Sequence, residues 1–215
     1  MGGADKLWAR LASRTGRERP LLAYAVAAFQ QCAAVARIVL VVAEEAVERG
    51  RALARDEVFD KVCAVVAGGA RRQDSVRAGL EALGPSAWVI VHDGARPLIT
   101  VDLIERGLAE AQETGAACCA LPAADTVKEA NEAGHIARTL NRSRLWLAQT
   151  PQVFRYDLLL EAHRRPSAGR DASDDAALVE ALGVPVRLYP GSPHNLKVTT
   201  PEDLALVQAL LRQGA

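Results

Sequence analysis

The sequence predicts an α/β protein whose mostly parallel sheet is covered by helices on both faces. Short runs rich in β-branched residues alternate along the chain with longer segments of helical periodicity. The short runs are apolar throughout, which is typical of strands buried on both faces. Of the 215 residues, 50% are hydrophobic and 24% are charged, and this composition supports a sizeable core. At about 150 residues per domain, we expect residues 1–215 to form one domain.

The first half of the chain predicts three strands, each followed by a helix. Glycines end the second strand, apolar side chains recur at the helical period in the second helix, and Gly84-Pro85 stops that helix. The expected strands lie at 37–42, 62–66 and 88–91, and the expected helices at 44–55, 74–83 and 101–113.

The second half continues the alternation after Gly115. Ser173 is expected to cap a helix that runs to Leu182. Thr200 is expected to cap the last helix, with Pro201 at its first position. The other expected elements are strands at 116–121, 186–189 and 195–198 and a helix at 156–163.

A polar segment at 125–140 interrupts the pattern. Residues 126–128 and 135–139 flank a turn-like stretch and predict a β-hairpin. The hairpin has little apolar surface, and an isolated hairpin is marginally stable. We therefore expect a protruding arm within residues 125–150 that needs a partner, in the same chain or in another.

Composition excludes several classes of function. Lysine plus arginine and aspartate plus glutamate both total 26, and aromatic residues make up 4%, so neither a basic field nor a stacking platform for nucleic acid is expected. No apolar run approaches the roughly 20 residues of a membrane span, and no secretory signal precedes the first elements. The four cysteines form no C-x-x-C pair, which favours buried thiols in a reducing cytoplasm.

The segment Val91–Pro97 is the strongest candidate for chemistry. It follows a predicted buried strand, and open α/β sheets bind ligands at the carboxyl ends of their strands. Asp93 there suits a divalent metal that bridges phosphates, and Arg96 could pair with a phosphate oxygen. The alternative is an aspartate that only caps the following turn. His92 is better explained as orienting Asp93 than as a base.

Three further segments carry weaker signals. Gly68-Gly69 and Ser75 lie between a strand and a helix, where backbone amides favour an anion, although a charged loop with a capping serine explains them equally. Lys6 beside glycines could neutralise phosphate, or it could belong to a frayed terminus. Lys197 in a short strand suggests a buried anionic partner, with a surface lysine as the alternative. Arg142 by default belongs to a solvated charged face.

Other catalytic patterns are missing from the sequence. No H-x-x-x-H or Cys/His set occurs, so no zinc site is expected. No G-x-S-x-G motif occurs, and Ser75 has no histidine close by in the sequence to activate it.

In order along the chain, these segments resemble the 2-C-methyl-D-erythritol 4-phosphate cytidylyltransferase family. The resemblance covers nearly the whole chain, and the His-Asp-Gly-Ala-Arg-Pro and Thr-Pro-Gln segments are its most specific parts. The matching residues are Gly3–Lys6, Pro20–Leu22, Gly68-Gly69 with Asp74–Val76, Val91–Pro97, Asp125–Lys128, Asn141-Arg142, Gln149–Phe154, Ser173–Asp175, and Asn195–Thr199 with Pro201–Asp203.

The resemblance implies a Rossmann-like fold of the nucleotide-diphospho-sugar transferase type, a Mg²⁺ requirement, and a homodimer formed by an exchanged β-arm. It implies a reaction in which the phosphate of 2-C-methyl-D-erythritol 4-phosphate attacks CTP, releasing pyrophosphate in non-mevalonate isoprenoid biosynthesis. The implied roles are Lys6 on the triphosphate, Asp93 on the metal, Gly68, Ser75 and Gly94 on the nucleotide, and Arg96, Thr126, Arg142, Thr150 and Lys197 around the sugar phosphate. Lys6 and Lys197 would be the catalytic cations, and Thr126 and Arg142 would come from the arm of a second subunit.

The sequence departs from the family at its start. Members begin with a buried strand and an Ala-Ala-Gly-x-G-x-R-Met loop, and Met1 aligns with the methionine that ends the loop. Without that strand, the central sheet is expected to lack an interior member. Two explanations compete: a natural protein that starts earlier, which the intact downstream residues favour, or a truncated and inactive chain.

Two alternative functions remain open from the sequence. A cytidylyltransferase for another polyol phosphate, such as ribitol 5-phosphate, would use the same fold. A non-catalytic nucleotide-binding homologue would bind CTP weakly or not at all and release no pyrophosphate.

Overall fold

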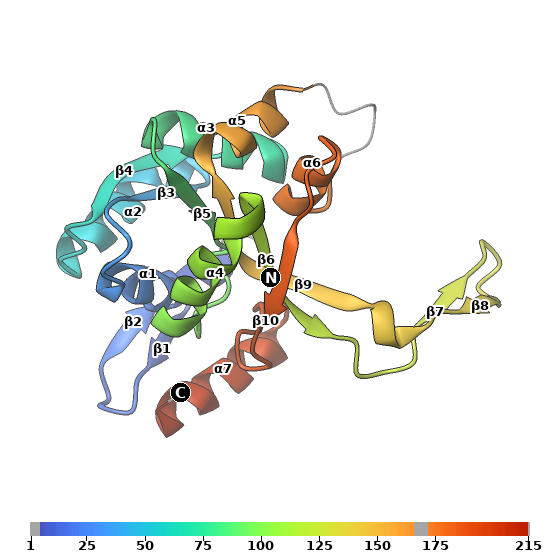
Figure 1. Ribbon diagram of the computed structural model, residues 1–215. Coiled ribbons are helices and arrows are strands. Elements are labelled where there is room, and N and C mark those ends of the chain that lie inside the picture. Colours follow the sequence, from blue (N-terminus) through green and yellow to red (C-terminus); the bar gives the residue numbers. More distant parts are fainter. Residues whose placement is uncertain (1–4, 166–171, 215) are drawn as a thin grey trace.

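The computed structural model describes residues 5–165 and 172–214, in which helices and strands alternate as an α/β protein (Figure 1). The α-helices are α1 (Leu21–Gln31), α2 (Val47–Asp56), α3 (Arg72–Leu83), α4 (Val101–Thr114), α5 (Tyr156–Arg164), α6 (Asp175–Glu180) and α7 (Pro201–Gln213). Short 3-10 helices are η1 (Asp5–Trp8), η2 (Glu44–Ala46) and η3 (Arg142–Arg144). The strands are β1 (Arg10–Ala12), β2 (Glu18–Pro20), β3 (Ile38–Val42), β4 (Val62–Ala67), β5 (Trp88–Val91), β6 (Ala116–Pro122), β7 (Lys128–Ala130), β8 (Ile136–Thr139), β9 (Trp146–Arg155) and β10 (Arg187–Pro190).

The largest sheet has four strands in the order β10-β6-β9-β5. β10 runs parallel to β6, whereas β9 lies antiparallel to both β6 and β5. The sequence did not predict β9, because its polar residues around Gln149-Thr150 hide the apolar pattern. β9 nevertheless lies in the interior of this sheet and positions one of the predicted site residues, Thr150.

The strands β3 and β4 form a separate parallel pair. Within the described residues, β3 and β5 share no ladder, so the central sheet is divided at this point. This division agrees with the expected lack of an interior strand. Helices link the two parts, because α3 packs against β3 and β4 and also contacts α5.

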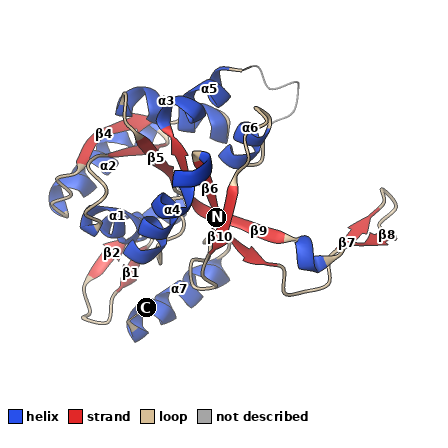
Figure 2. Cartoon of the chain, in the orientation of Figure 1, coloured by secondary structure: helices blue, strands red, loops and turns tan. Residues whose placement is uncertain are grey.

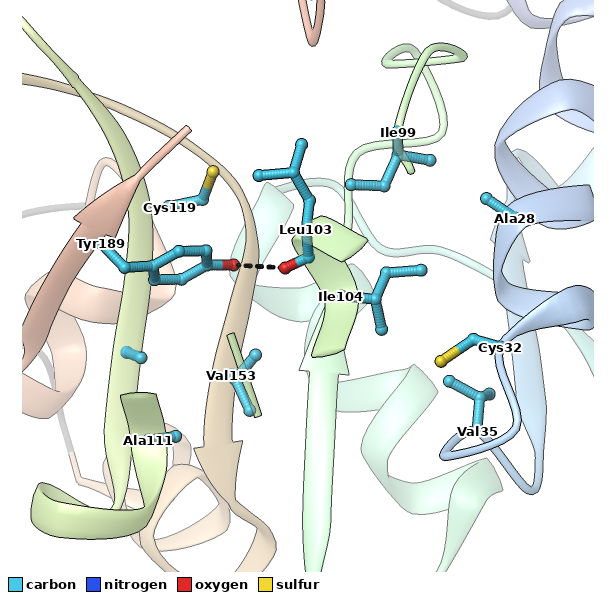
Figure 3. Packing of buried hydrophobic residues seen from close by; sticks show 11 residues of the cluster. Ala28, Cys32, Val35, Ile99, Leu103, Ile104, Ala111, Cys119, Val153 and Tyr189 are labelled. Atoms are coloured by element: carbon cyan, nitrogen blue, oxygen red, sulfur yellow. Dashed lines mark hydrogen bonds between the residues drawn. The ribbon is translucent and has the colours of Figure 1, made fainter. Parts of the chain in front are cut away.

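Helices cover both faces of the four-stranded sheet, as the sequence predicts (Figure 2). On one face, α4 packs against β6, β9 and β10, and α1 packs against α4. The hydroxyl group of Tyr189 donates a hydrogen bond to the Leu103 carbonyl at 3.3 Å (Figure 3). On the other face, α3, α5 and α6 surround Phe154. The adjacent Cys118 and Cys119 point to opposite faces, and burial raises the pKa of their thiols to about 12 and about 11.

Two local expectations were wrong. The N-cap of α6 is Asp174 rather than Ser173, because the Asp174 carboxylate accepts a hydrogen bond from the Ala177 amide at 2.9 Å. Residues 195–198 form no strand, because the Val198 amide makes a single bond to the Ala95 carbonyl and no ladder continues from it. The cap of α7 is confirmed, with Pro201 in its first turn and a reciprocal capping box between Thr200 and Asp203.

The segment between β6 and β9 forms the arm that the sequence predicts. β7 and β8 pair as an antiparallel hairpin, and the arm projects from the body (Figure 1). Every residue of β7 and β8 is exposed, including Ile136 at 65%. The end of β6 pairs with Trp146 and Leu147 of β9 at the base of the arm.

No helix in the described ranges 5–165 and 172–214 is long and apolar enough to cross a membrane.

Candidate active site

A cluster of charged side chains lies where β5 ends. The Lys197 ammonium group, from the loop between β10 and α7, lies 3.0 Å from Oδ2 of Asp93. The Arg96 Nε atom lies 3.4 Å from the same oxygen. The anionic partner that the sequence suggested for Lys197 is therefore Asp93, although Lys197 belongs to a loop and its side chain is 42% exposed.

The cluster keeps Asp93 ionised. Burial alone raises the pKa of this carboxyl group, but the positive charge and hydrogen bond of Lys197, with Arg96 and Arg72 farther away, lower it more. The net effect is a pKa below the usual value for aspartate. An ionised carboxylate beside several cations can bind a divalent metal while the cations bind phosphate.

The buried side chains of Arg96 and Asn195 fix the position of this cluster through hydrogen bonds to the backbone. The buried Arg96 guanidinium donates through Nη1 to the carbonyl group of Asn195 at 2.8 Å. The Asn195 amide group in turn donates to the Thr150 carbonyl at 2.7 Å. Asn195 is fully buried and was not among the predicted site residues. It ties the β5 end, the middle of β9 and the Lys197 loop together.

A cavity lies next to the predicted nucleotide residues. It encloses about 290 Å³ and is lined by residues that include Leu7, Gly68 and Ser75. Ser75 Oγ accepts a hydrogen bond from the Gly69 amide at 3.1 Å. A Cβ atom on Gly68 would lie 2.6 Å from Ser75 Oγ, so the loop between β4 and α3 needs glycine for this close approach.

Gly94 lies on the same side of the site. A Cβ atom on Gly94 would lie 3.7 Å from Leu7, which also lines the cavity beside Gly68 and Ser75. The three residues predicted to bind the nucleotide therefore gather around η1. Lys6 precedes Leu7 in η1, and its side chain makes no hydrogen bond or ion pair with the described residues.

The two arm residues lie apart from this cluster within one chain. Thr126 and Arg142 are both exposed, at the base of the arm. The Arg142 guanidinium group donates to the carbonyl group of Ala124. A single chain therefore brings together the body residues of the predicted site and leaves the arm residues outside it.

Arg72 is a further cation of the site that the predicted residue set omitted. It lies in the first turn of α3 and lowers the pKa of Asp93. Its Nη2 atom lies 2.7 Å from Oδ2 of Asp175, which is fully buried and also contacts His163 at 2.8 Å. The pair of arginines at the start of this helix was the available sequence signal, but the anchoring of Arg72 by Asp175 is a tertiary contact.

The donor set fits a magnesium ion shared with a substrate. Both cations approach Oδ2 of Asp93, so Oδ1 is the oxygen better placed to bind a metal. No group of three metal-ligating side chains occurs in the described part of the chain. Magnesium needs no such group, because it commonly binds one or two carboxylates together with substrate phosphates.

The fold defines a Rossmann-like α/β protein. Its site gathers cations around one carboxylate at the end of a strand, and a site of this kind is suited to anionic substrates. The family model for 2-C-methyl-D-erythritol 4-phosphate cytidylyltransferase matches residues 2–213. The chain belongs to this family.

Individual relatives agree with the family match. An enzyme of that name from Dehalococcoides mccartyi (strain CBDB1) is 45% identical over 214 residues, which are 100% of this chain and 91% of the relative. One from Desulforamulus reducens is 46% identical over 201 residues, covering 92% of this chain and 86% of the relative.

Solved structures of family members have the same fold. The crystal structure of the cytidylyltransferase from Thermus thermophilus has a TM-score of 0.80 and 37% identity, and the match covers 98% of this chain and 95% of that one. The 4-diphosphocytidyl-2C-methyl-D-erythritol synthase from Anaerococcus prevotii has a TM-score of 0.82 at 26% identity, covering 92% and 87%.

Proposed function

We propose that this chain transfers the cytidylyl group of CTP to 2-C-methyl-D-erythritol 4-phosphate and releases pyrophosphate, as a step of non-mevalonate isoprenoid biosynthesis. The observation that carries the proposal is the contact of Lys197 and Arg96 with the Asp93 carboxylate at the end of β5. Two anionic reactants can approach each other only where cations offset their charge. Membership of the family supplies the identity of both substrates.

The body residues bind and orient the reacting groups. Lys197 and Arg96 bind the phosphate of the sugar alcohol in place of the Asp93 carboxylate. The phosphate nucleophile is therefore held beside that carboxylate. The phosphate oxygen then attacks the α-phosphorus of CTP in line with the departing pyrophosphate. A phosphate monoester is already nucleophilic near neutral pH, so no catalytic histidine is required.

Magnesium would be held by Asp93 and by phosphate oxygens. When bound, it supplies charge neutralisation for the triphosphate. Gly68, Ser75 and Gly94 surround the cytidine, and Lys6 neutralises the triphosphate. The close approach of Gly68 to Ser75 and the hydrogen bond from the Gly69 amide to Ser75 Oγ hold the glycine loop beside the serine.

The arm completes the acceptor site in a homodimer. An exposed hairpin without a core of its own gains stability when it packs on another molecule. Exchange of the arm would bring Thr126 and Arg142 of a second copy to the sugar phosphate. We place the enzyme in the cytoplasm, where its free thiols stay reduced.

The test is pyrophosphate release by the 215-residue chain from CTP and 2-C-methyl-D-erythritol 4-phosphate with Mg²⁺. Turnover with this acceptor and none with ribitol 5-phosphate is the expected result. Turnover with ribitol 5-phosphate alone would reassign the acceptor. Binding of CTP without release of pyrophosphate under any of these conditions would identify a non-catalytic homologue.

A further inference from the structure

Three hydrogen bonds connect His92 to the turn that presents the reactive side chains. The amide group of Asp93 donates to Oγ1 of Thr150 at 3.0 Å. Oγ1 of Thr150 lies 3.0 Å from Nδ1 of His92. On the other side of the ring, Nε2 of His92 lies 3.1 Å from the carbonyl oxygen of Arg96.

Donor and acceptor chemistry determines the direction of this chain of bonds. A carbonyl oxygen only accepts, so Nε2 of His92 must carry a proton and donate to Arg96. A neutral imidazole then has a bare Nδ1, which accepts the hydroxyl proton of Thr150. In this neutral form each ring nitrogen has one hydrogen bond of the matching kind, because Nε2 donates to a carbonyl and Nδ1 accepts from a hydroxyl group.

The turn held in this way carries Asp93, the predicted metal ligand, and Arg96, the predicted phosphate contact. The Arg96 amide donates to the Asp93 carbonyl at 2.9 Å and closes the turn over residues 93–96. His92 binds the far end of that turn directly, at the Arg96 carbonyl. It binds the near end through Thr150, at the Asp93 amide.

We propose that His92 is a positioning residue that clamps the 93–96 turn from both ends, in the Nε2-protonated form, and uses the Thr150 hydroxyl group as its second contact. The clamp sets the separation of the Asp93 carboxylate and the Arg96 guanidinium group. The importance of that separation for turnover rests on the proposed function, whereas the hydrogen-bond direction does not.

The clamp restricts what Thr150 can do in the acceptor site. Its hydroxyl proton is committed to His92, and one lone pair of Oγ1 accepts the Asp93 amide. Thr150 therefore cannot donate a hydrogen bond to an anionic phosphate while the clamp is formed. It can only accept, which suits a hydroxyl group of the polyol rather than its phosphate.

Nitrogen NMR of the ¹⁵N-labelled full chain tests the direction without needing activity. The chain contains four histidines, and the His92 ring is assigned by its loss in His92→Phe. That variant keeps an aromatic ring against Phe29, whose centroid lies 5.1 Å from that of His92. We expect a neutral ring protonated on Nε2 at neutral pH, with an Nδ1 shift that moves when Thr150 is changed to valine. A proton on Nδ1 overturns the proposal.

Kinetics test the effect on the turn. We expect Thr150→Val and His92→Phe each to lower kcat about tenfold and to raise the Mg²⁺ concentration for half-maximal rate, with KM for CTP little changed. Thr150→Ser keeps the hydroxyl group and should restore the rate. Because both residues act through one clamp, the double variant should be no slower than either single variant.

Two kinetic results contradict the clamp. One is a multiplicative loss in the double variant, and the other is equal rates for Thr150→Val and Thr150→Ser. If the wild-type chain releases no pyrophosphate at all, the proposed function fails, and the NMR result still decides the hydrogen-bond direction.

Discussion

The body and the arm of this chain hold their polar side chains in different ways. In the body, Asp93, Arg96 and Asn195 are bound to one another or to the same backbone segments, and Asn195 is fully buried. In the arm, Arg138 pairs with Glu129 and Lys128 bonds to Thr139, all on exposed positions.

Exposed pairs of this kind contribute little, about 0–1 kcal/mol each. A single chain therefore determines the site geometry in the body but not the position of the arm. The body residues of the predicted site are therefore preorganised, whereas the placement of the arm residues Thr126 and Arg142 depends on what the arm contacts. Variants in the body and in the arm test that division, from the largest expected effect to the smallest.

Asp93→Asn should reduce kcat by about a hundredfold or more while leaving the fold intact, because it removes the carboxylate proposed for the metal. Pyrophosphate release and circular dichroism measure the two effects. Asp102→Asn is the matched control, since Asp102 pairs with Arg106 on the surface and its side chain is 73% exposed. A similar loss of kcat in the control would contradict a specific role of Asp93.

Arg96→Ala in the body and Arg142→Ala in the arm should differ in their effect on the free energy of unfolding. Arg96→Ala leaves the buried Asn195 carbonyl without its donor and should lower the free energy of unfolding by about 2 kcal/mol, together with the rate. Arg142→Ala should change the unfolding free energy by less than about 0.5 kcal/mol, because Arg142 is exposed.

Arg142→Ala also tests the part of the site proposed to bind the sugar phosphate. Arg142→Ala should raise KM for the sugar phosphate about tenfold and leave KM for CTP unchanged. Equal weakening of both substrates would count against its proposed role. Urea titrations and steady-state kinetics on both arginine variants provide the comparison.

In the proposed homodimer, Ile136→Ser should shift the equilibrium from dimer towards monomer, because Ile136 is an apolar residue on β8 whose exposed fraction is 65%. Sedimentation velocity over a range of concentrations measures the change. Leu206→Ser is the matched control on α7 of the body, where Leu206 is 52% exposed. Equal behaviour of the two variants would show that the arm does not form the interface.

Acid should weaken the cap of α7. Hydrogen bonds from the Thr199 hydroxyl group and from the amides of Thr199 and Thr200 lower the pKa of Asp203 to about 2. The unfolded chain binds a proton at this residue near pH ~4, so its stabilising effect is complete above that pH and is lost as the pH falls towards the folded-state pKa. Asp203→Asn should flatten this part of the stability profile, as measured by unfolding midpoints between about pH 5 and pH 2. An unchanged slope would mean that other carboxylates dominate.

Several site residues could be predicted because their signals are local. Asp93 lies two residues after an apolar strand, and Gly68 and Ser75 bracket the start of a helix. Asn195 and Arg72 were missed because their roles come from partners that are distant in sequence. Asn195 acts through Arg96 and the Thr150 carbonyl, and Arg72 is anchored by Asp175.

By itself, the sequence determined where most strands and helices lie, because hydrophobic periodicity, glycines and caps act over a few residues. It also determined that a carboxylate stands at the end of β5 and that 125–150 cannot form a core alone. Only the tertiary structure decided that β9 lies antiparallel between β5 and β6, which brings Thr150 to the Asp93 amide. Strand pairing and the contact of Lys197 with Asp93 join segments that are distant along the chain, and such contacts depend on how the whole core packs.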